Sequence, residues 1–290
     1  MTLLDYQVFW EISHLGSFAA AAKKLHLTPS AISHAVAGME RECGFSLFQR
    51  AKNGVSLTSG GRRLLPAAQQ VLASQESFRQ TLEEINGLAR GHVSIGTFNS
   101  VCTTWLPPLI KLFRSRNPGI QVEVYQGSYQ DVANWLKEGV VDLGILSEDA
   151  AAEFQFTPLS RDKLVCVVPD NFTPAAGDHI QVEELEGQPF VLQSSGSNVD
   201  IRDFFKRHHM ELQVSCHVQD DQACIALVES GLGICVVPEL VLKCFARPIR
   251  AYPIRPEEYR VIGLAVMAGT TLTPAARELS KAICSVGELS

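Results

Sequence analysis

The side chains best suited to contact another molecule form a short run of hydroxyl and imidazole groups near the N-terminus. Thr28, Ser30, Ser33 and His34 stand close together and are separated by small or apolar residues. Such groups can donate and accept hydrogen bonds at DNA base edges and phosphates. The chain contains no Gly-rich phosphate loop, nucleophile elbow or metal motif. This pattern favours recognition of another molecule over catalysis.

Two short helices are predicted to position these groups. The alanine-rich segment Phe18–Leu25 favours a helix, and Thr28 is a suitable N-cap for a second helix over Pro29–Cys43. The residues expected to face inward recur at helical spacing and are Ile32, Val36 and Met39. A helical pair whose second helix exposes a small polar face is typical of a helix-turn-helix, which enters the DNA major groove. The alternative is an ordinary helical hairpin in a core.

A hairpin and a long helix are predicted to follow. Asn53-Gly54, at the centre of 51–57, is typical of a tight turn between strands, which would form a wing. Arg50 and Lys52 at its base are expected to bind phosphates. In the helix over 62–88, residues in steps of three and four form a heptad seam: Leu64, Ala68, Val71, Gln75, Phe78, Leu82 and Ile85. We favour pairing of this helix with a second subunit over packing within its own domain.

The segment from Ser17 to Gly61, SFAAAAKKLHLTPSAISHAVAGMERECGFSLFQRAKNGVSLTSGG, resembles the N-terminal domain of LysR-type transcriptional regulators. The resemblance implies a winged helix-turn-helix and a linker helix that pairs two subunits on inverted-repeat half-sites of promoter DNA. It departs at Met39, where Leu is usual, and at His34, where Arg is frequent, so no operator sequence is inferred. The residues assigned to DNA contact are Phe18, Thr28, Pro29, Ser30, Ser33, His34, Ala37, Arg50 and Lys52.

The charge distribution agrees with a DNA-binding end. The chain has a net charge of −6, but its first 63 residues carry seven basic and four acidic side chains, a net +3. A basic head on an acidic body suits a protein that touches DNA with one end. The N-terminus lacks signal-peptide features, and no apolar run reaches the roughly 20 residues of a membrane span. The expected location is the bacterial cytoplasm, at the nucleoid, with no membrane partner.

From His92 onward, short apolar strands alternate with helices, which indicates an α/β domain with a parallel sheet. The late strand 259–267 is expected to return to the first lobe, so that two crossing strands join two lobes around a cleft. The predicted fold class is multidomain, with an all-α winged helix-turn-helix head and linker helix, then two α/β Rossmann-like subdomains of the type 2 periplasmic-binding-protein-like kind. The predicted domains are 1–59, 60–90 and 91–290, with lobe I at 91–162 and 267–290 and lobe II at 163–266.

Three loops at the carboxyl ends of predicted strands, 97–103, 126–128 and 193–198, are candidates for ligand binding. The family resemblance implies that they line an effector cleft; the alternative is that their hydroxyls only cap helices. The candidate effector-binding residues are Phe98, Asn99, Ser100, Cys102, Gly127, Ser128, Ser194, Ser195 and Ser197. The loops hold no Arg or Lys, although Arg161 and Lys163 lie near the hinge. A small carboxylate, a neutral molecule and an aromatic one therefore all stay open.

The predicted function is a LysR-type DNA-binding transcriptional regulator, not an enzyme, whose promoter binding is modulated by a small-molecule effector. Subunits are expected to pair through the linker helix and to associate again into a homotetramer, with RNA polymerase as a further partner. No cofactor or metal is predicted, because the eight cysteines have no metal-ligand spacing. The alternatives are a cytoplasmic solute-binding protein, a coiled-coil adaptor, and a thiol-based redox-sensing regulator using Cys102, Cys216 or Cys224.

Overall fold

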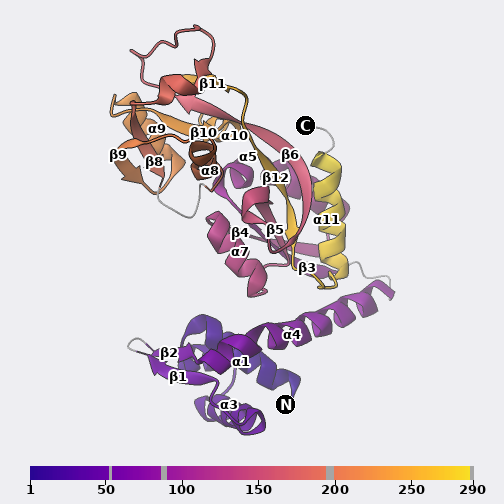
Figure 1. Cartoon of the computed structure of the whole chain (residues 1–290). Helices are drawn as coiled ribbons and strands as arrows, with labels where there is room; N and C mark the ends of the chain where they lie inside the picture. Colours follow the sequence, from indigo (N-terminus) through magenta and orange to yellow (C-terminus); the bar gives the residue numbers. More distant parts are fainter. Residues whose placement is uncertain (52–53, 86–89, 194–198, 288–290) are drawn as a thin grey trace. The chain divides into compact units, whose positions relative to one another are not determined.

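The computed structural model describes residues 1–51, 54–85, 90–193 and 199–287 of the chain. These residues fold into two compact units (Figure 1). The N-terminal unit comprises Met1–Arg90 with the short segments 137–140 and 269–275. The rest of the chain forms the second unit, called here the effector unit. The predicted domain boundaries stay a prediction.

The N-terminal unit packs short helices around a small apolar core and carries one hairpin. Its elements are α1 (Leu3–Leu15), α2 (Phe18–Lys24), α3 (Pro29–Cys43), β1 (Phe48–Ala51), β2 (Gly54–Leu57) and α4 (Ser59–Ile85). The predicted helix-turn-helix is confirmed, since Thr28 Oγ1 accepts the Ala31 N–H at 3.2 Å as the N-cap of α3. Ile32, Val36 and Met39 are buried, as predicted. The helical spacing therefore fixed which face of α3 is left outside.

The predicted wing is also confirmed. Strands β1 and β2 are antiparallel, with Ala51 opposite Gly54. Gly54 has φ +130°, and a Cβ there would lie 2.5 Å from the Gly16 carbonyl oxygen, so this position requires glycine. Helix α4 begins at Ser59, earlier than the predicted Arg62, because the Thr58 hydroxyl accepts the Gly61 N–H at 3.0 Å and caps the first turn. Its predicted end at Leu88 lies outside the described residues.

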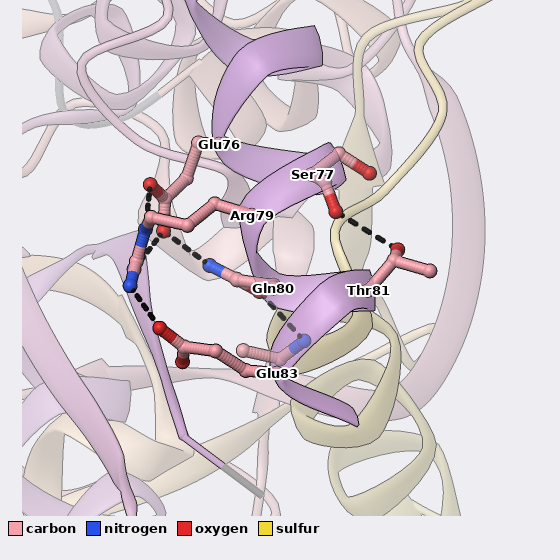
Figure 2. Close-up of polar contacts among 7 residues, drawn as sticks. Glu76, Ser77, Arg79, Gln80, Thr81 and Glu83 are labelled. Carbon is pink, nitrogen blue, oxygen red and sulfur yellow. Dashed lines mark hydrogen bonds and ion pairs between the residues drawn. The ribbon is translucent and has the colours of Figure 1, made fainter. Parts of the chain in front are cut away.

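Helix α4 carries an apolar stripe on its surface. Phe78 and Ile85 keep 73% and 76% of their area exposed, and Val71 and Leu82 are exposed too. Of the predicted seam, Ala68 is buried within the unit. Figure 2 shows how the helix is supported beside the stripe: Arg79 binds the carboxylates of Glu76 and Glu83, one turn to either side. Such pairs stabilise a helix by roughly 0.2–0.5 kcal/mol each.

The effector unit is built on a mixed sheet with the strand order β4-β3-β5-β12-β6-β11-β7, and β10 pairs with β6. The strands are β3 (Gly91–Thr97), β4 (Ile120–Gln126), β5 (Leu143–Ser147), β6 (Gln155–Val167), β7 (Ile180–Gln181), β10 (Cys235–Pro238), β11 (Ala251–Arg255) and β12 (Tyr259–Val266). A separate parallel pair is formed by β8 (Pro189–Gln193) and β9 (Gln213–Val218). The helices are α5 (Asn99–Thr104), α6 (Leu106–Arg116), α7 (Tyr129–Lys137), α8 (Val199–Arg207), α9 (Asp221–Glu229), α10 (Glu239–Leu242) and α11 (Pro274–Gly287), with 3₁₀ turns at Glu148–Ala150 and Val182–Leu185.

The two crossing strands predicted from the sequence are β6 and β12. The first part of β6 pairs with β12, which also pairs with β5, whereas its last residues pair with β10 and β11. Strand β6 therefore runs from one lobe into the other, as the long ribbon in Figure 1 shows. The prediction of a parallel sheet is right for β3, β4 and β5 and wrong for β12 and β6, which are antiparallel to their neighbours. They are antiparallel because the chain crosses between the lobes in both directions.

Candidate functional site

The outer face of α3 is one candidate site. Thr28, Pro29, Ser30, Ser33, His34 and Ala37 are all exposed. Their side chains are small, so the helix backbone can approach a partner closely, as a recognition helix does in the major groove. Phe18 differs, because it is half-buried and its ring lies edge-on to Phe48 with a centroid distance of 5.8 Å. Lys52 and the side chain of Arg50 lie outside the described residues.

The second candidate site is a cavity of about 460 Å³ in the effector unit. Its lining includes Phe98, Asn99 and Ser100 at the start of α5 and Gly127 and Ser128 before α7. A Cβ on Gly127 would lie 2.7 Å from the Trp135 ring and 2.8 Å from Asp131 Cβ, so glycine keeps this loop close to α7. Cys102 is not among the described residues that line the cavity. Ser194, Ser195 and Ser197 lie outside the described part of the chain.

A buried arginine that the sequence analysis did not select forms the base of this cavity. Arg260 on β12 is 4% exposed. Its Nε donates to Asp162 Oδ2 at 2.8 Å, its Nη1 to the Tyr129 hydroxyl at 2.9 Å, and its Nη2 to Ser100 Oγ at 2.9 Å. Nη2 also lies 2.7 Å from Asp162 Oδ2. The guanidinium lies over the Phe98 ring, 4.8 Å from its centroid, which adds a cation–π contact.

This network joins the lobes. Tyr129 on α7 accepts from Arg260 and donates to Asp200 Oδ2 on α8 at 2.9 Å, while Asp162 Oδ1 accepts the Leu240 N–H of α10 at 3.0 Å. Burial raises the pKa of the Tyr129 hydroxyl, so it stays protonated and keeps donating. Burial disfavours the charge of Arg260, but Tyr129, Asp162 and Asp200 outweigh burial and hold its pKa above the ordinary value. The base of the cavity is therefore a charged but internally paired cluster.

Most of the charged side chains on the described walls of the cavity are carboxylates. Asp131, Asp200, Asp220 and Asp221 line it, and Arg260 is the only basic side chain among the described lining residues. Asp221 Oδ1 accepts from the Gln193 amide at 2.6 Å. Burial raises the pKa of both Asp200 and Asp221, and Arg260 partly opposes the shift. Apolar groups, including Val191, Val236 and Val237, complete the wall.

The sequence held a signal for Arg260 that was missed. Side chains alternate between the two faces of a strand, and Arg260 and Asp162 are direct partners across β12 and β6. The hinge cations considered from the sequence, Arg161 and Lys163, flank Asp162 and are exposed. Both lie over the Tyr259 ring, at 4.6 and 6.0 Å from its centroid. A charged residue inside the otherwise apolar strand 259–266 could have indicated a buried ion pair.

Family comparisons match this architecture over almost the whole chain. Residues 3–62 match the model of the bacterial regulatory helix-turn-helix protein, lysR family, and residues 86–285 match the LysR substrate binding domain. The chain belongs to the LysR family. A probable HTH-type transcriptional regulator, LrrA of Synechococcus elongatus, is 31% identical over 94% of this chain and 93% of that protein. This LysR-type chain is thus a DNA-binding transcriptional regulator with an effector-binding domain, which confirms that part of the main prediction.

Solved structures share the fold of this LysR-family chain. A full-length OxyR variant from Pseudomonas aeruginosa superposes with a TM-score of 0.78 at 22% identity, over 98% of this chain and 94% of that one. The effector-binding domain of QuiR in complex with shikimate gives 0.63 at 23% identity, over 69% of this chain and 98% of that one. At these identities the likeness shows the fold. It confirms the predicted winged head followed by a two-lobed, periplasmic-binding-like domain.

Three of the thiols, those of Cys166, Cys224 and Cys235, are buried, whereas Cys102 and Cys216 are partly exposed. Burial raises the pKa of Cys102, and the neighbouring Cys224 thiol together with burial raises that of Cys235. Burial likewise raises the pKa of Cys166. A raised pKa lowers the thiolate fraction that reacts with oxidants. Within the described residues, no group of three His, Cys, Asp or Glu side chains is arranged to bind a metal ion, and no helix is long and apolar enough to span a membrane.

Proposed function

We propose that this LysR-family regulator binds promoter DNA as a dimer or higher oligomer, and that a small molecule in the cavity of the effector unit modulates that binding. The observation that carries the proposal is the cavity itself. It is lined by residues of both lobes and by Arg260 of the crossing strand β12, and its base is one hydrogen-bonded network from Ser100 to Asp200. A ligand there would change how the lobes are held together, and so bias the lobe angle.

Pairing of two α4 helices is supported by their surface. Val71, Phe78, Leu82 and Ile85 form an exposed apolar stripe with steps of seven, four and three residues. That spacing suits a coiled-coil seam, and its burial against a second copy would remove these side chains from water. A paired helix would present two copies of α3 to two half-sites. Association into a tetramer, contact with RNA polymerase and a place at the bacterial nucleoid belong to the same proposal.

The DNA part is tested by footprinting the purified protein on the DNA upstream of its own gene, with random competitor DNA. We expect a protected region with two half-sites in helical phase. The variant Ser33→Glu/His34→Glu places two carboxylates on the exposed face of α3 and should abolish specific protection, because like charges repel at the phosphates. A footprint that survives this change would contradict the role of α3.

A matched control separates DNA recognition from folding. Asn171→Glu/Thr173→Glu places two carboxylates at exposed positions of the effector unit, and it should leave protection in place at saturating protein. Both variants should keep the circular dichroism spectrum of the parent, because the α3 side chains are exposed. Loss of protection together with loss of helix content would indicate a folding defect.

A further inference from the structure

Three of the helix N-termini that face the cavity, those of α7, α8 and α9, carry the chain's own carboxylates, whereas the first turn of α5 carries none. At α7, Asp131 Oδ2 accepts the Ser128 N–H at 2.8 Å, and at α9 Asp220 accepts the Ala223 N–H at 2.8 Å. Asp200 and Asp221 stand in the first turns of α8 and α9. Helix N-termini attract anions through free N–H groups and the positive end of the dipole. Two carboxylates accept N–H groups at these N-termini and two more stand in the first turns, so an anionic ligand would meet like charges there.

The arginine at the base of the cavity cannot offset these carboxylates for an anion. Arg260 already donates to Asp162, Tyr129 and Ser100, and it forms its ion pair with Asp162. The pair is buried, at 4% and 8% side-chain exposure. Recruiting Arg260 to an anionic ligand would leave Asp162 buried without its partner, which is strongly unfavourable. The remaining carboxylates make the cavity electronegative.

Two of the carboxylates have capacity to accept more hydrogen bonds. Asp200 is 4% exposed, and neither its Oδ1 nor the Ser147 hydroxyl, both buried, has a partner in hydrogen-bonding geometry among the described residues. The Ser147 hydroxyl lowers the pKa of Asp200 without cancelling the effect of burial. Asp221 is half-buried, and the bond from Gln193 uses only its Oδ1. A buried acceptor without a donor is costly, and a donor brought by a ligand removes that cost.

We propose that the effector of this regulator is a small organic cation, a protonated amine or guanidine on an apolar body, whose N–H groups bind Asp221 and Asp200. This inference rests on the proposed function of the cavity and names its ligand class. The apolar body would lie against Val191, Val236 and Val237, and about 460 Å³ suits a metabolite-sized molecule. The cation donates to Oδ1 of Asp200, while Oδ2 keeps the hydrogen bond from the Tyr129 hydroxyl of α7. Binding is thereby coupled to the contact between α7 and α8.

The test uses matched probes that differ only in the end group. Butyl, phenylethyl and cyclohexylmethyl skeletons are each tried as the amine, the alcohol and the carboxylate, with thermal unfolding of the full chain at neutral pH as readout. We expect at least one amine to raise the melting temperature and its alcohol and carboxylate not to, because only the amine gains a charge-assisted hydrogen bond. We expect the Kd of that amine to be lower than the Kd of its alcohol by a factor of about ten or more. If carboxylates stabilise the protein and amines do not, or if all amines act like their alcohols, the inference is overturned.

Two variants locate the cation. Asp221→Asn and Asp200→Asn keep shape and hydrogen bonding but remove the charge, and each should weaken amine binding about tenfold or more. Asp170→Asn, at an exposed position, is the matched control and should bind amines like the parent. Unchanged amine affinity in both cavity variants would overturn the assignment to this cavity. Footprinting separates the proposed ligand class from the proposed regulatory function. DNA protection that responds only to carboxylates would overturn the ligand class alone. Amine binding to a protein that protects no promoter would overturn the regulatory function alone.

Discussion

The face of α3 and the base of the effector cavity use side chains in opposite ways. On α3, residues adjacent in sequence stand exposed and have few partners within the chain. At the base of the cavity, Ser100, Tyr129, Asp162 and Arg260 come from distant parts of the chain and saturate one another with hydrogen bonds. Function on α3 should therefore be separable from stability, whereas at the cavity base the same groups support both.

This difference also suggests what each region has to do. DNA is a large polyanion, and a small polar helix face on a basic head is sufficient to approach it. A small molecule offers few contacts, so its site has to be preorganised and largely enclosed. The cavity meets that requirement with a buried ion pair, and three predictions test how far the contrast holds.

The largest effect is expected at the centre of the network. Arg260→Ala leaves the Asp162 carboxylate buried without its ion-pair partner, and we expect a loss of about 3–5 kcal/mol in the free energy of unfolding of the effector unit. Urea unfolding followed by tryptophan fluorescence measures this, since Trp105 and Trp135 belong to that unit. Arg247→Ala removes an ion pair with Glu229 that is exposed, and it should leave the midpoint unchanged. Equal effects of the two variants would contradict a structural role for the buried pair.

A smaller effect is expected at Thr28, where DNA contact and helix stability depend on the same side chain. Thr28 lies on the proposed DNA-binding face but also caps α3, since its hydroxyl accepts the Ala31 N–H. Thr28→Ala should destabilise the first turn of α3 by about 1 kcal/mol, seen as faster amide hydrogen exchange there. Ser74→Ala removes an exposed hydroxyl on α4 that donates to the Gln70 carbonyl. It should leave amide hydrogen exchange in α3 unchanged. No change in exchange after Thr28→Ala would mean that the cap adds nothing to helix stability.

The smallest effect concerns the pH dependence of the buried carboxylate. Because burial raises the pKa of Asp200, the folded chain binds its proton more tightly than the unfolded chain does. This group therefore destabilises the fold progressively as pH rises from the ordinary Asp pKa through the raised one. Asp200→Asn removes that contribution, and its stability relative to the parent should increase over this window. Urea midpoints compared at pH values across the window measure the difference; a constant difference would contradict the raised pKa.

Sequence reasoning succeeded where the determining interactions are local. Short segments of sequence carry the cap at Thr28, the helical spacing of Ile32, Val36 and Met39, and the tight turn at Gly54. The positions of α3 and of the wing could therefore be predicted closely. It was less successful for β6, which starts at Gln155, although only its last residues, from Leu164 onward, form an apolar run typical of a strand. The charged residues Arg161 and Lys163 interrupt the apolar pattern, so the first part of β6 does not have the sequence pattern of a strand. Only pairing with β12, about a hundred residues away, makes that segment extended.

The sequence by itself determined the winged helix-turn-helix, the apolar stripe of the linker helix, the two-lobed architecture and the loops before α5 and α7 that line the cavity. Only the tertiary structure decided the charge of that cavity. Arg260 and Asp162 meet through strand register, while Tyr129 and Asp200 meet because β6 and β12 bring the lobes together. The loops alone left anionic and neutral ligands open, because charge in a cavity depends on which distant groups neutralise each other. Such pairing is a property of contacts across the fold and is not visible in local spacing.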